Sequence, residues 1–363
     1  MPTFDIGEER SIPAGSTQQF DVDPVFLLAT ERSGSNLTRS ILNAHPDLTA
    51  PHPLETAYPW RSTASPNDLS SRQRRRLVRD VLVNKHYSFQ PLVDPLCVPR
   101  VQERVESAGV PSYLTVQEAL YREYVEVTDT ERWVSKDPGQ WHYIDEFLSY
   151  YDDPKVVYLV RDARDVALSF KNSNVGKYHP YYTAGRWAEE QRSGLAMLDT
   201  LPEERIHLLR YQDLLQDPEA EVREVCSFLG IPFEERMLYY YDTEEAQQES
   251  ESADVLGNIA IPIKSDNFDK FLDKLTAEEI RIVEKVVGEE LEAFGFELVN
   301  DEATLEGFEP DEAAYEEAEG RLNRAAALED WRSETGEQVA RYAGRSFSIY
   351  MILRYGMLAG SGF

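Results

Sequence analysis

Cysteine is nearly absent from this sequence, and long apolar runs are missing. The 363 residues include two cysteines, Cys97 and Cys226, too few for a disulfide framework or a cysteine metal cluster. No apolar run reaches the roughly 20 residues that a membrane-spanning helix needs. The first eleven residues, MPTFDIGEERS, lack the basic start and apolar core of a signal peptide. We therefore expect a soluble protein in a reducing compartment, the cytoplasm.

Lysine is also scarce. There are 9 lysines, 28 arginines and 66 acidic residues, for a formal net charge of −29 at pH 7. Such an acidic surface repels phosphate backbones, which argues against non-specific binding to nucleic acids. Acid-rich, lysine-poor surfaces are typical of proteins from salt-accumulating cells, because salt screens the repulsion between carboxylates. The composition favours a halophilic-type protein, with an ordinary acidic bacterial enzyme as the alternative.

Strands and helices are predicted to alternate along most of the chain. Buried strands are expected over 25–28, 132–137, 155–160 and 205–210. Amphipathic helices are expected after residues 35, 140 and 163, and over about 181–200 and 218–229. This alternation is typical of an α/β fold in which helices cover both faces of a parallel sheet.

The chain is predicted to divide into three parts. A lead-in over 1–20 precedes an α/β domain over 21–300, whose last helix begins at Thr276 with the capping-box pattern of an acidic residue three positions later. An extension over 301–363 is acidic first and then basic and amphipathic over 341–358. We expect exposed helices or a mobile arm in its acidic half. The basic half is expected to contact an anionic membrane surface, the domain itself or a second subunit.

A strand, a tight turn and a helix follow one another over 25–42. The turn contains Arg32, Ser33, Gly34 and Ser35, and backbone N–H groups at such a turn point toward one spot in front of the strand. The glycine allows an anion to approach closely, the hydroxyls add donors, and the arginine adds a charged fork. The pattern indicates a phosphate site, although an ordinary helix cap also explains it. No lysine lies in the turn, so it is not the GxxxxGK[ST] loop of ATPases.

A second candidate phosphate site follows the strand over 155–160. Arg161 stands at the strand end and Ser169 lies two turns into the next helix, so both side chains can reach one anion. Asp162 and Asp165 in the same motif offer a structural explanation, because they can pair with arginine or cap the helix.

Together these motifs resemble the sulfotransferase superfamily, whose sulfuryl donor is 3′-phosphoadenosine 5′-phosphosulfate (PAPS). The resemblance rests on R-S-G-S at 32–35 and R-D-x-R-D-x-x-x-S at 161–169. A-H-P-D at 44–47 and K-D-P at 136–138 are similar to the tyrosylprotein sulfotransferases and related bacterial enzymes. The resemblance implies a P-loop-like α/β fold with the 5′-phosphosulfate at the first motif and the 3′-phosphate at the second.

The resemblance also implies further donor contacts. Tyr211 matches a tyrosine near the nucleotide, and Lys264 matches a lysine that reaches the 3′-phosphate. Asn36 departs from the usual threonine, so an amide replaces one hydroxyl donor. A basic residue expected four positions after Ser169 is missing, and Lys171 lies nearby.

Catalysis is expected to depend on positioning and charge. We expect Arg32 and the N–H groups of the turn to hold the 5′-phosphate and the sulfuryl oxygens, and Lys136 to neutralise charge on the bridging oxygen or the sulfuryl group, without a metal. Glu55 or His52, in the proline-rich loop expected over 49–59, would accept the proton of an acceptor hydroxyl on a carbohydrate, a glycolipid or another alcohol, with Glu55 favoured. The product would be adenosine 3′,5′-bisphosphate (PAP).

Two other functions fit the pattern less well. A non-catalytic nucleotide-binding or carbohydrate-binding module would retain the fold, and a phosphotransferase would retain the phosphate loop.

An arginine-rich helix over 71–83 is expected either to balance local acidic residues or to form the rim of an anionic substrate site.

Overall fold

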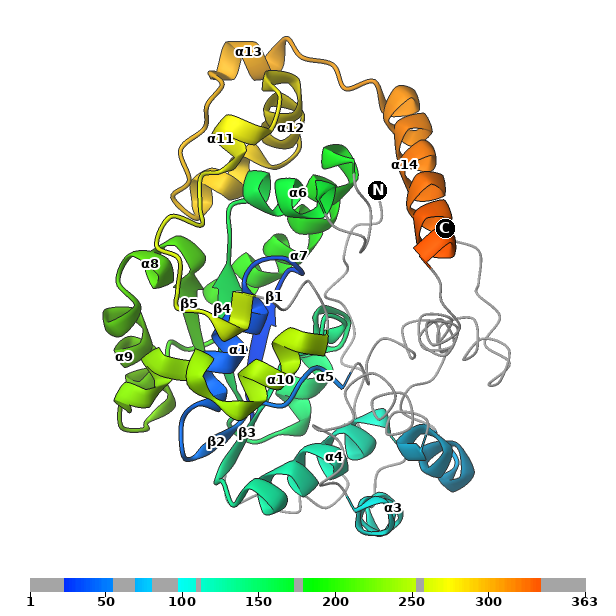
Figure 1. Ribbon diagram of the computed structural model, residues 1–363, viewed down its shortest axis with the longest axis vertical. Coiled ribbons are helices and arrows are strands. Elements are labelled where there is room, and N and C mark those ends of the chain that lie inside the picture. The colour runs from blue at the N-terminus through cyan, green and yellow to red at the C-terminus, as the bar shows by residue number, and fades with distance from the viewer. Residues whose placement is uncertain are drawn as a thin grey trace.

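The strand that leads into the predicted turn is the centre of a parallel sheet (Figure 1). The computed structural model describes residues 23–54, 69–79, 97–108, 112–172, 179–252 and 258–333. The five strands lie in the order β2-β3-β1-β4-β5, and every neighbouring pair is parallel. Their bounds are Val25–Ala29 (β1), Leu48–Thr49 (β2), Arg132–Ser135 (β3), Lys155–Val160 (β4) and Ile206–Arg210 (β5). The predicted α/β class is confirmed.

Helices cover both faces of this sheet. On the first face lie α4, α5, α7 and α12, and on the second lie α1, α9 and the 3-10 helix η3. The bounds of the helices before β5 are Ser35–Asn43 (α1), Val98–Ser107 (α3), Tyr113–Thr128 (α4), Gln140–His142 (η2), Ile144–Tyr150 (α5), Ala163–Lys171 (α6) and Pro180–Thr200 (α7). Those after β5 are Tyr211–Gln216 (α8), Pro218–Leu229 (α9), Glu235–Asp242 (η3), Glu244–Ser252 (α10), Phe271–Lys274 (α11), Ala277–Ala293 (α12), Glu302–Glu306 (α13) and Glu312–Ser333 (α14).

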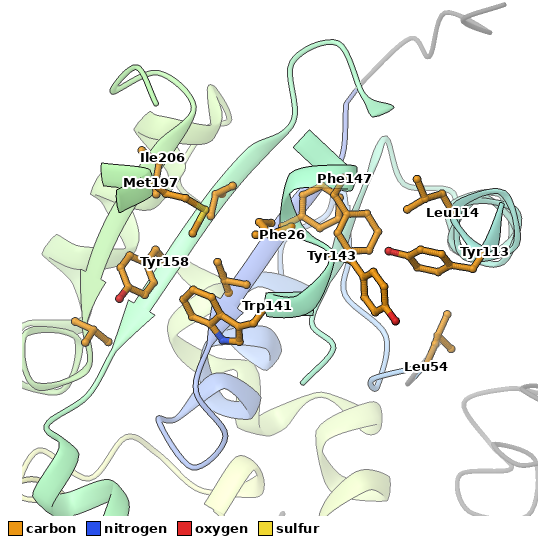
Figure 2. Packing of buried hydrophobic residues seen from close by; sticks show 14 of the residues in the cluster. Phe26, Leu54, Tyr113, Leu114, Trp141, Tyr143, Phe147, Tyr158, Met197 and Ile206 are labelled. Carbon is orange, nitrogen blue, oxygen red and sulfur yellow. The ribbon is translucent and has the colours of Figure 1, made fainter. Parts of the chain in front are cut away.

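Alternation along β1 assigns its side chains to the two faces. Phe26 and Leu28 belong to the hydrophobic cluster of the first face, whereas Val25 and Leu27 belong to that of the second. The centroid of the Phe26 ring lies 4.7 Å from that of Phe147 on α5, and Tyr113 of α4 continues the cluster with its ring centroid 6.0 Å from that of Phe147 (Figure 2). Since β1 is buried on both faces, the turn after it has a rigid support.

The last helix of the predicted α/β domain begins as the sequence indicates. Thr276 is the N-cap of α12: its Oγ1 accepts from the N–H of Glu279 at 3.2 Å, and its own N–H donates to the Glu279 carboxylate at 2.8 Å. The predicted capping box is confirmed.

The extension contains α13 and α14, and most described side chains over 301–314 are exposed. Tyr315 of α14 stacks on His179 with ring centroids 4.6 Å apart, and Glu319 accepts from the His179 N–H at 2.9 Å. The basic segment 341–358 and the lead-in 1–20 lie outside the described residues. The boundaries of the three parts stay a prediction.

The arginine-rich segment is a helix over the described residues 71–79. Leu77 and Val78 are buried, and Arg75 pairs with Glu106 on α3 at 2.7 Å. This contact agrees with a role in balancing local acidic charge.

Candidate functional site

The turn between β1 and α1 has a backbone that only particular residues adopt. Arg32 has a φ of 71° and Gly34 a φ of 92°, both in the left-handed region. A Cβ on Gly34 would overlap the ring of Tyr211, so glycine is needed for the close approach as well as for the dihedral angle. Two buried polar atoms, Ser33 Oγ in this turn and Asn36 Oδ1 at the start of α1, have no hydrogen-bond partner among the described residues. Such atoms indicate a site that is completed by a ligand or by water.

The structure brings the two predicted phosphate motifs together. Arg32 Nε donates to Ser169 Oγ at 3.1 Å, and Arg161 donates to the Arg32 carbonyl at 3.0 Å. The Arg161 guanidinium also lies over the Tyr211 ring, 4.7 Å from its centroid. One anionic ligand of nucleotide size can therefore contact both motifs.

A cavity of about 540 Å³ lies in front of these residues. Among the residues that the structure describes, six cationic side chains line it against two carboxylates, Glu31 and Asp165, in a chain whose net charge is −29. The cations are Arg32, Lys136, Arg161, Lys264, Lys270 and Lys274. Four of the nine lysines thus gather at one site, which indicates a multiply charged anion as its ligand.

Arg32 lies in an environment that disfavours its own charge. Burial lowers the pKa of its guanidinium, the neighbouring Arg161 lowers it further, and Glu31 opposes both effects. The negative charge of an anion bound near both arginines would stabilise the charged form of Arg32 and so offset this lowering of its pKa.

Glu31 lines the cavity, and Arg186 of α7 neutralises its charge. Arg186 pairs with Glu31 at 2.6 Å and with Glu190 at 3.1 Å. Burial works against the charge of Arg186, but the two carboxylates raise its pKa overall. The pairing reduces the repulsion that Glu31 would exert on an anion.

A polar network behind Arg161 fixes the segment that follows Lys264. Asn267 donates from Nδ2 to Tyr211 Oη at 2.9 Å, and its carbonyl accepts from Arg161 at 3.2 Å. Asp165 is fully buried and accepts from the N–H groups of Asp269 at 2.8 Å and Phe271 at 3.1 Å. Its pKa is raised by burial, against the opposing charge of Arg161.

The expected catalytic residues are placed only in part. Lys136 follows the last residue of β3 and lines the cavity, as does His52. Asp137 holds the turn behind Lys136 by accepting from the Gly139 N–H at 3.0 Å. Glu55 lies outside the described residues, so its role stays a prediction.

All nine residues that are expected to bind the donor line this cavity or lie in the turn after β1. Arg32, Gly34, Ser35, Asn36, Arg161, Ser169, Tyr211 and Lys264 line the cavity directly, and Ser33 lies buried in the turn. Lys171 does not take the place of the missing basic residue, because it pairs with Glu279 at 2.7 Å and is not among the residues lining the cavity.

Three residues that line the cavity were not predicted as site residues: Asn267, Lys270 and Lys274. A signal was present, since three of the nine lysines fall within the eleven residues from 264 to 274. An apolar wall from Ile259, Ile261 and Ile263 was also not predicted.

The described residues include no cluster of three or more His, Cys, Asp or Glu side chains arranged to hold a metal ion. Over the same residues, every helix is too short or too polar to cross a membrane.

Comparisons with known proteins give a matching family model, curated relatives and solved structures of similar fold. The model of the Sulfotransferase family matches residues 24–235. An uncharacterized protein from Aquifex aeolicus is 26% identical over 230 residues, 61% of this chain and 27% of that protein. A putative protein-tyrosine sulfotransferase from Caenorhabditis briggsae is 24% identical over 265 residues, 68% of this chain and 81% of that protein. The solved sulfotransferase domain from the Synechococcus PCC 7002 olefin synthase is similar in fold, with a TM-score of 0.53 and 20% identity over 78% of this chain and 98% of that domain.

Proposed function

Because this chain belongs to the sulfotransferase family, we propose that it transfers a sulfuryl group from PAPS to a hydroxyl group of an acceptor. The observation that carries the proposal is the hydrogen bond between Arg32 and Ser169, which joins the two phosphate motifs at one cationic cavity. A nucleotide with phosphate groups on both the 3′ and 5′ oxygens needs such a pair of sites. A nucleoside triphosphate carries all its phosphates in one chain on the 5′ oxygen, so it does not need a second phosphate site.

The residues present fit this donor. Ser33 Oγ and Arg161 Nε are buried and have no hydrogen-bond partner among the described residues. Arg161 Nε and the hydroxyl of Ser33 are donors that phosphate oxygens would satisfy. Arg32 and the turn would hold the 5′-phosphosulfate, and Arg161, Ser169 and Lys264 would hold the 3′-phosphate.

The donor supplies a sulfuryl group, which forms a bond to the acceptor oxygen as the bond to the 5′-phosphate oxygen breaks and PAP leaves. Arg32 and Lys136 line the cavity, and they would stabilise negative charge on the sulfuryl oxygens and on the leaving phosphate. Glu55 would accept the hydroxyl proton, with His52 as the competing base.

For the acceptor we propose an alcohol, such as that of a carbohydrate or a glycolipid. The apolar wall from residues 259, 261 and 263 offers a surface for an uncharged part of a ligand. Contact of the basic segment 341–358 with a membrane surface or a second subunit stays a separate prediction.

Calorimetric titration tests the donor. We expect PAP to bind more tightly than ATP with Mg²⁺, because the cavity has two phosphate sites. Tighter binding of ATP would overturn the proposal in favour of a phosphotransferase. Incubation with ³⁵S-labelled PAPS and a mixture of carbohydrates, glycolipids and small alcohols tests transfer. PAP binding with no labelled product from any acceptor class would favour a non-catalytic binding module.

A further inference from the structure

Three lysines of one segment line the cavity, but the structure holds them differently. Lys264 is exposed, and its contact with Asn258 Oδ1 is long, at 3.5 Å. Lys274 is exposed at the end of α11. Lys270 is half-buried, and its Nζ donates to Asn267 Oδ1 at 2.7 Å. Of the three ammonium groups, that of Lys270 is the best positioned before any ligand binds.

Asn267 connects Lys270 with the candidate 3′-phosphate residues. Its side-chain oxygen accepts from Lys270, its amide nitrogen donates to Tyr211, and its carbonyl accepts from Arg161. Asn267 alone therefore links the Lys270 ammonium to the Arg161 guanidinium through hydrogen bonds. An anion at Arg161 would lie within the electrostatic influence of the Lys270 ammonium.

Asp165 fixes the backbone on both sides of Lys270. Its carboxylate accepts from the N–H of Asp269 at 2.8 Å and from that of Phe271 at 3.1 Å. Asp165 belongs to α6, the helix that also carries Ser169. The segment that presents Lys270 is thus held in register with Ser169, so the lysine and the serine keep a fixed relation to each other.

The charge balance of this site also calls for a second cation. A phosphate monoester carries a charge of about −1.5 to −2 at pH 7. Two donor nitrogens of Arg161 already bond to the carbonyls of Arg32 and Asn267. Lys171, the nearest lysine after Ser169 in sequence, is committed to Glu279. Arg161 and Ser169 alone would leave part of the phosphate charge uncompensated.

We propose that Lys270 is the principal lysine for the phosphate at Arg161 and Ser169, ahead of Lys264, and that it sets the preference for a nucleotide with a 3′-phosphate. This inference rests on the proposed function, because it assumes that the donor is PAPS. Lys270 acts by direct contact with the phosphate, while Asn267 and Asp165 position it.

Calorimetric titration with PAP and with adenosine 5′-monophosphate (AMP) separates the two phosphate sites. Lys270→Gln is expected to weaken PAP binding by about 10- to 100-fold, the usual effect of losing a charged hydrogen bond, and to change AMP binding less than about threefold. Lys270→Arg keeps the charge and should recover most of the PAP affinity. Lys264→Gln should weaken PAP less than Lys270→Gln does. Lys171→Gln is the matched control, since it removes an equal charge from outside the cavity, and should leave both affinities unchanged.

The outcomes distinguish this inference from the proposed function. If wild-type protein fails to bind PAP, the proposed function fails and the role of Lys270 fails with it. If wild-type protein binds PAP but Lys270→Gln binds it equally well, only the role of Lys270 is overturned. A greater loss from Lys264→Gln, or an equal loss of PAP and AMP binding in Lys270→Gln, also overturns it. Thermal unfolding of each variant shows whether a loss of affinity comes from misfolding.

Discussion

Arg32 Nε donates to Ser169 Oγ at 3.1 Å, although the two residues lie 137 positions apart in the chain. The contact crosses from the turn after β1 to the helix after β4, two strands that pair directly. Since adjacent parallel strands end at the same edge of a sheet, the motifs that follow them meet there. The phosphate sites are therefore neighbours because of the strand order.

Substitution of Arg32 should impair transfer more than donor binding. In Arg32→Gln we expect turnover to fall by about 10²- to 10³-fold, since a donor aimed at developing charge is removed. Arg32→Lys retains the charge but loses the planar fork and should recover only part of the rate. Turnover with labelled PAPS and PAP affinity by calorimetry measure the two effects. Turnover of Arg32→Gln equal to wild type would show that this side chain plays no part in transfer.

Gly34 should tolerate no side chain. Its φ of 92° and the overlap of an added Cβ with the Tyr211 ring predict that Gly34→Ala displaces the tyrosine and abolishes measurable PAP binding. Gly185→Ala is the matched control, because a Cβ at this position of α7 meets no atom within 4 Å. It should bind PAP normally and unfold at the same or a slightly higher temperature, since alanine favours a helix. Normal PAP binding by Gly34→Ala would contradict the requirement for close approach.

The buried pair between Arg39 and Glu249 should stabilise the fold far more than an exposed pair. Arg39 on α1 and Glu249 on α10 are hydrogen-bonded and nearly inaccessible, with side-chain exposures of 1% and 0%. Glu249→Ala would leave the arginine charge buried without this partner, at a cost of about 3–5 kcal/mol in the free energy of unfolding. Glu219→Ala breaks the exposed pair with Arg223 and should cost less than about 1 kcal/mol. Urea denaturation of both variants gives the comparison, and similar losses would contradict it.

Much of the fold was predictable because its strands are short apolar runs flanked by polar turns. The runs that became β1 and β4 are buried on both faces, so nearly every position is apolar and the signal is strong. Helix α4 was not predicted, although it contains 16 residues. Nine consecutive residues from Tyr113 to Tyr121 are buried, so polar and apolar side chains do not separate into two faces.

The site was predictable where a motif is local and not where tertiary contacts define it. Arg32 and Gly34 lie in one turn, so their relation could be inferred from neighbouring letters of the sequence. The position of Lys270 depends on Asp165, which lies 105 residues earlier and anchors the N–H groups on either side of it. Lys171 is the converse of Lys270. It lies two positions after Ser169 in the sequence, but it pairs with Glu279 and does not line the cavity.

The stability of the protein should rise with salt. With a net charge of −29, repulsion between carboxylates weakens the fold at low ionic strength, and the Debye length falls from about 10 Å at 0.1 M to about 3 Å at 1 M. We expect the thermal unfolding midpoint to increase between these KCl concentrations. KCl is preferable to a sulfate salt, which stabilises proteins by exclusion from their surfaces. A midpoint that stays flat or falls would contradict the halophilic-type interpretation.

The identity of the general base can be decided between Glu55 and His52. His52 lines the cavity, and histidine has the better intrinsic pKa for accepting a proton near neutral pH. Glu55 and Thr56 form a Glu-Thr pair that resembles the one in the tyrosylprotein sulfotransferases and related bacterial enzymes, although it lies two residues later than in their pattern. Glu55→Gln should therefore leave PAP binding nearly intact and lower turnover by about 10²- to 10⁴-fold.

The pH dependence of turnover provides an independent check on this assignment. A base must be deprotonated to act, so turnover should rise with pH and level off above the pKa of the base in the enzyme–substrate complex. If Glu55 is the base, Glu55→Gln removes this rise, whereas His52→Ala keeps it and loses less than about tenfold in turnover. The opposite outcome is near-normal turnover in Glu55→Gln together with loss of both the turnover and its increase with pH in His52→Ala. In that case the base is His52, because the Glu55 carboxylate is dispensable for proton transfer.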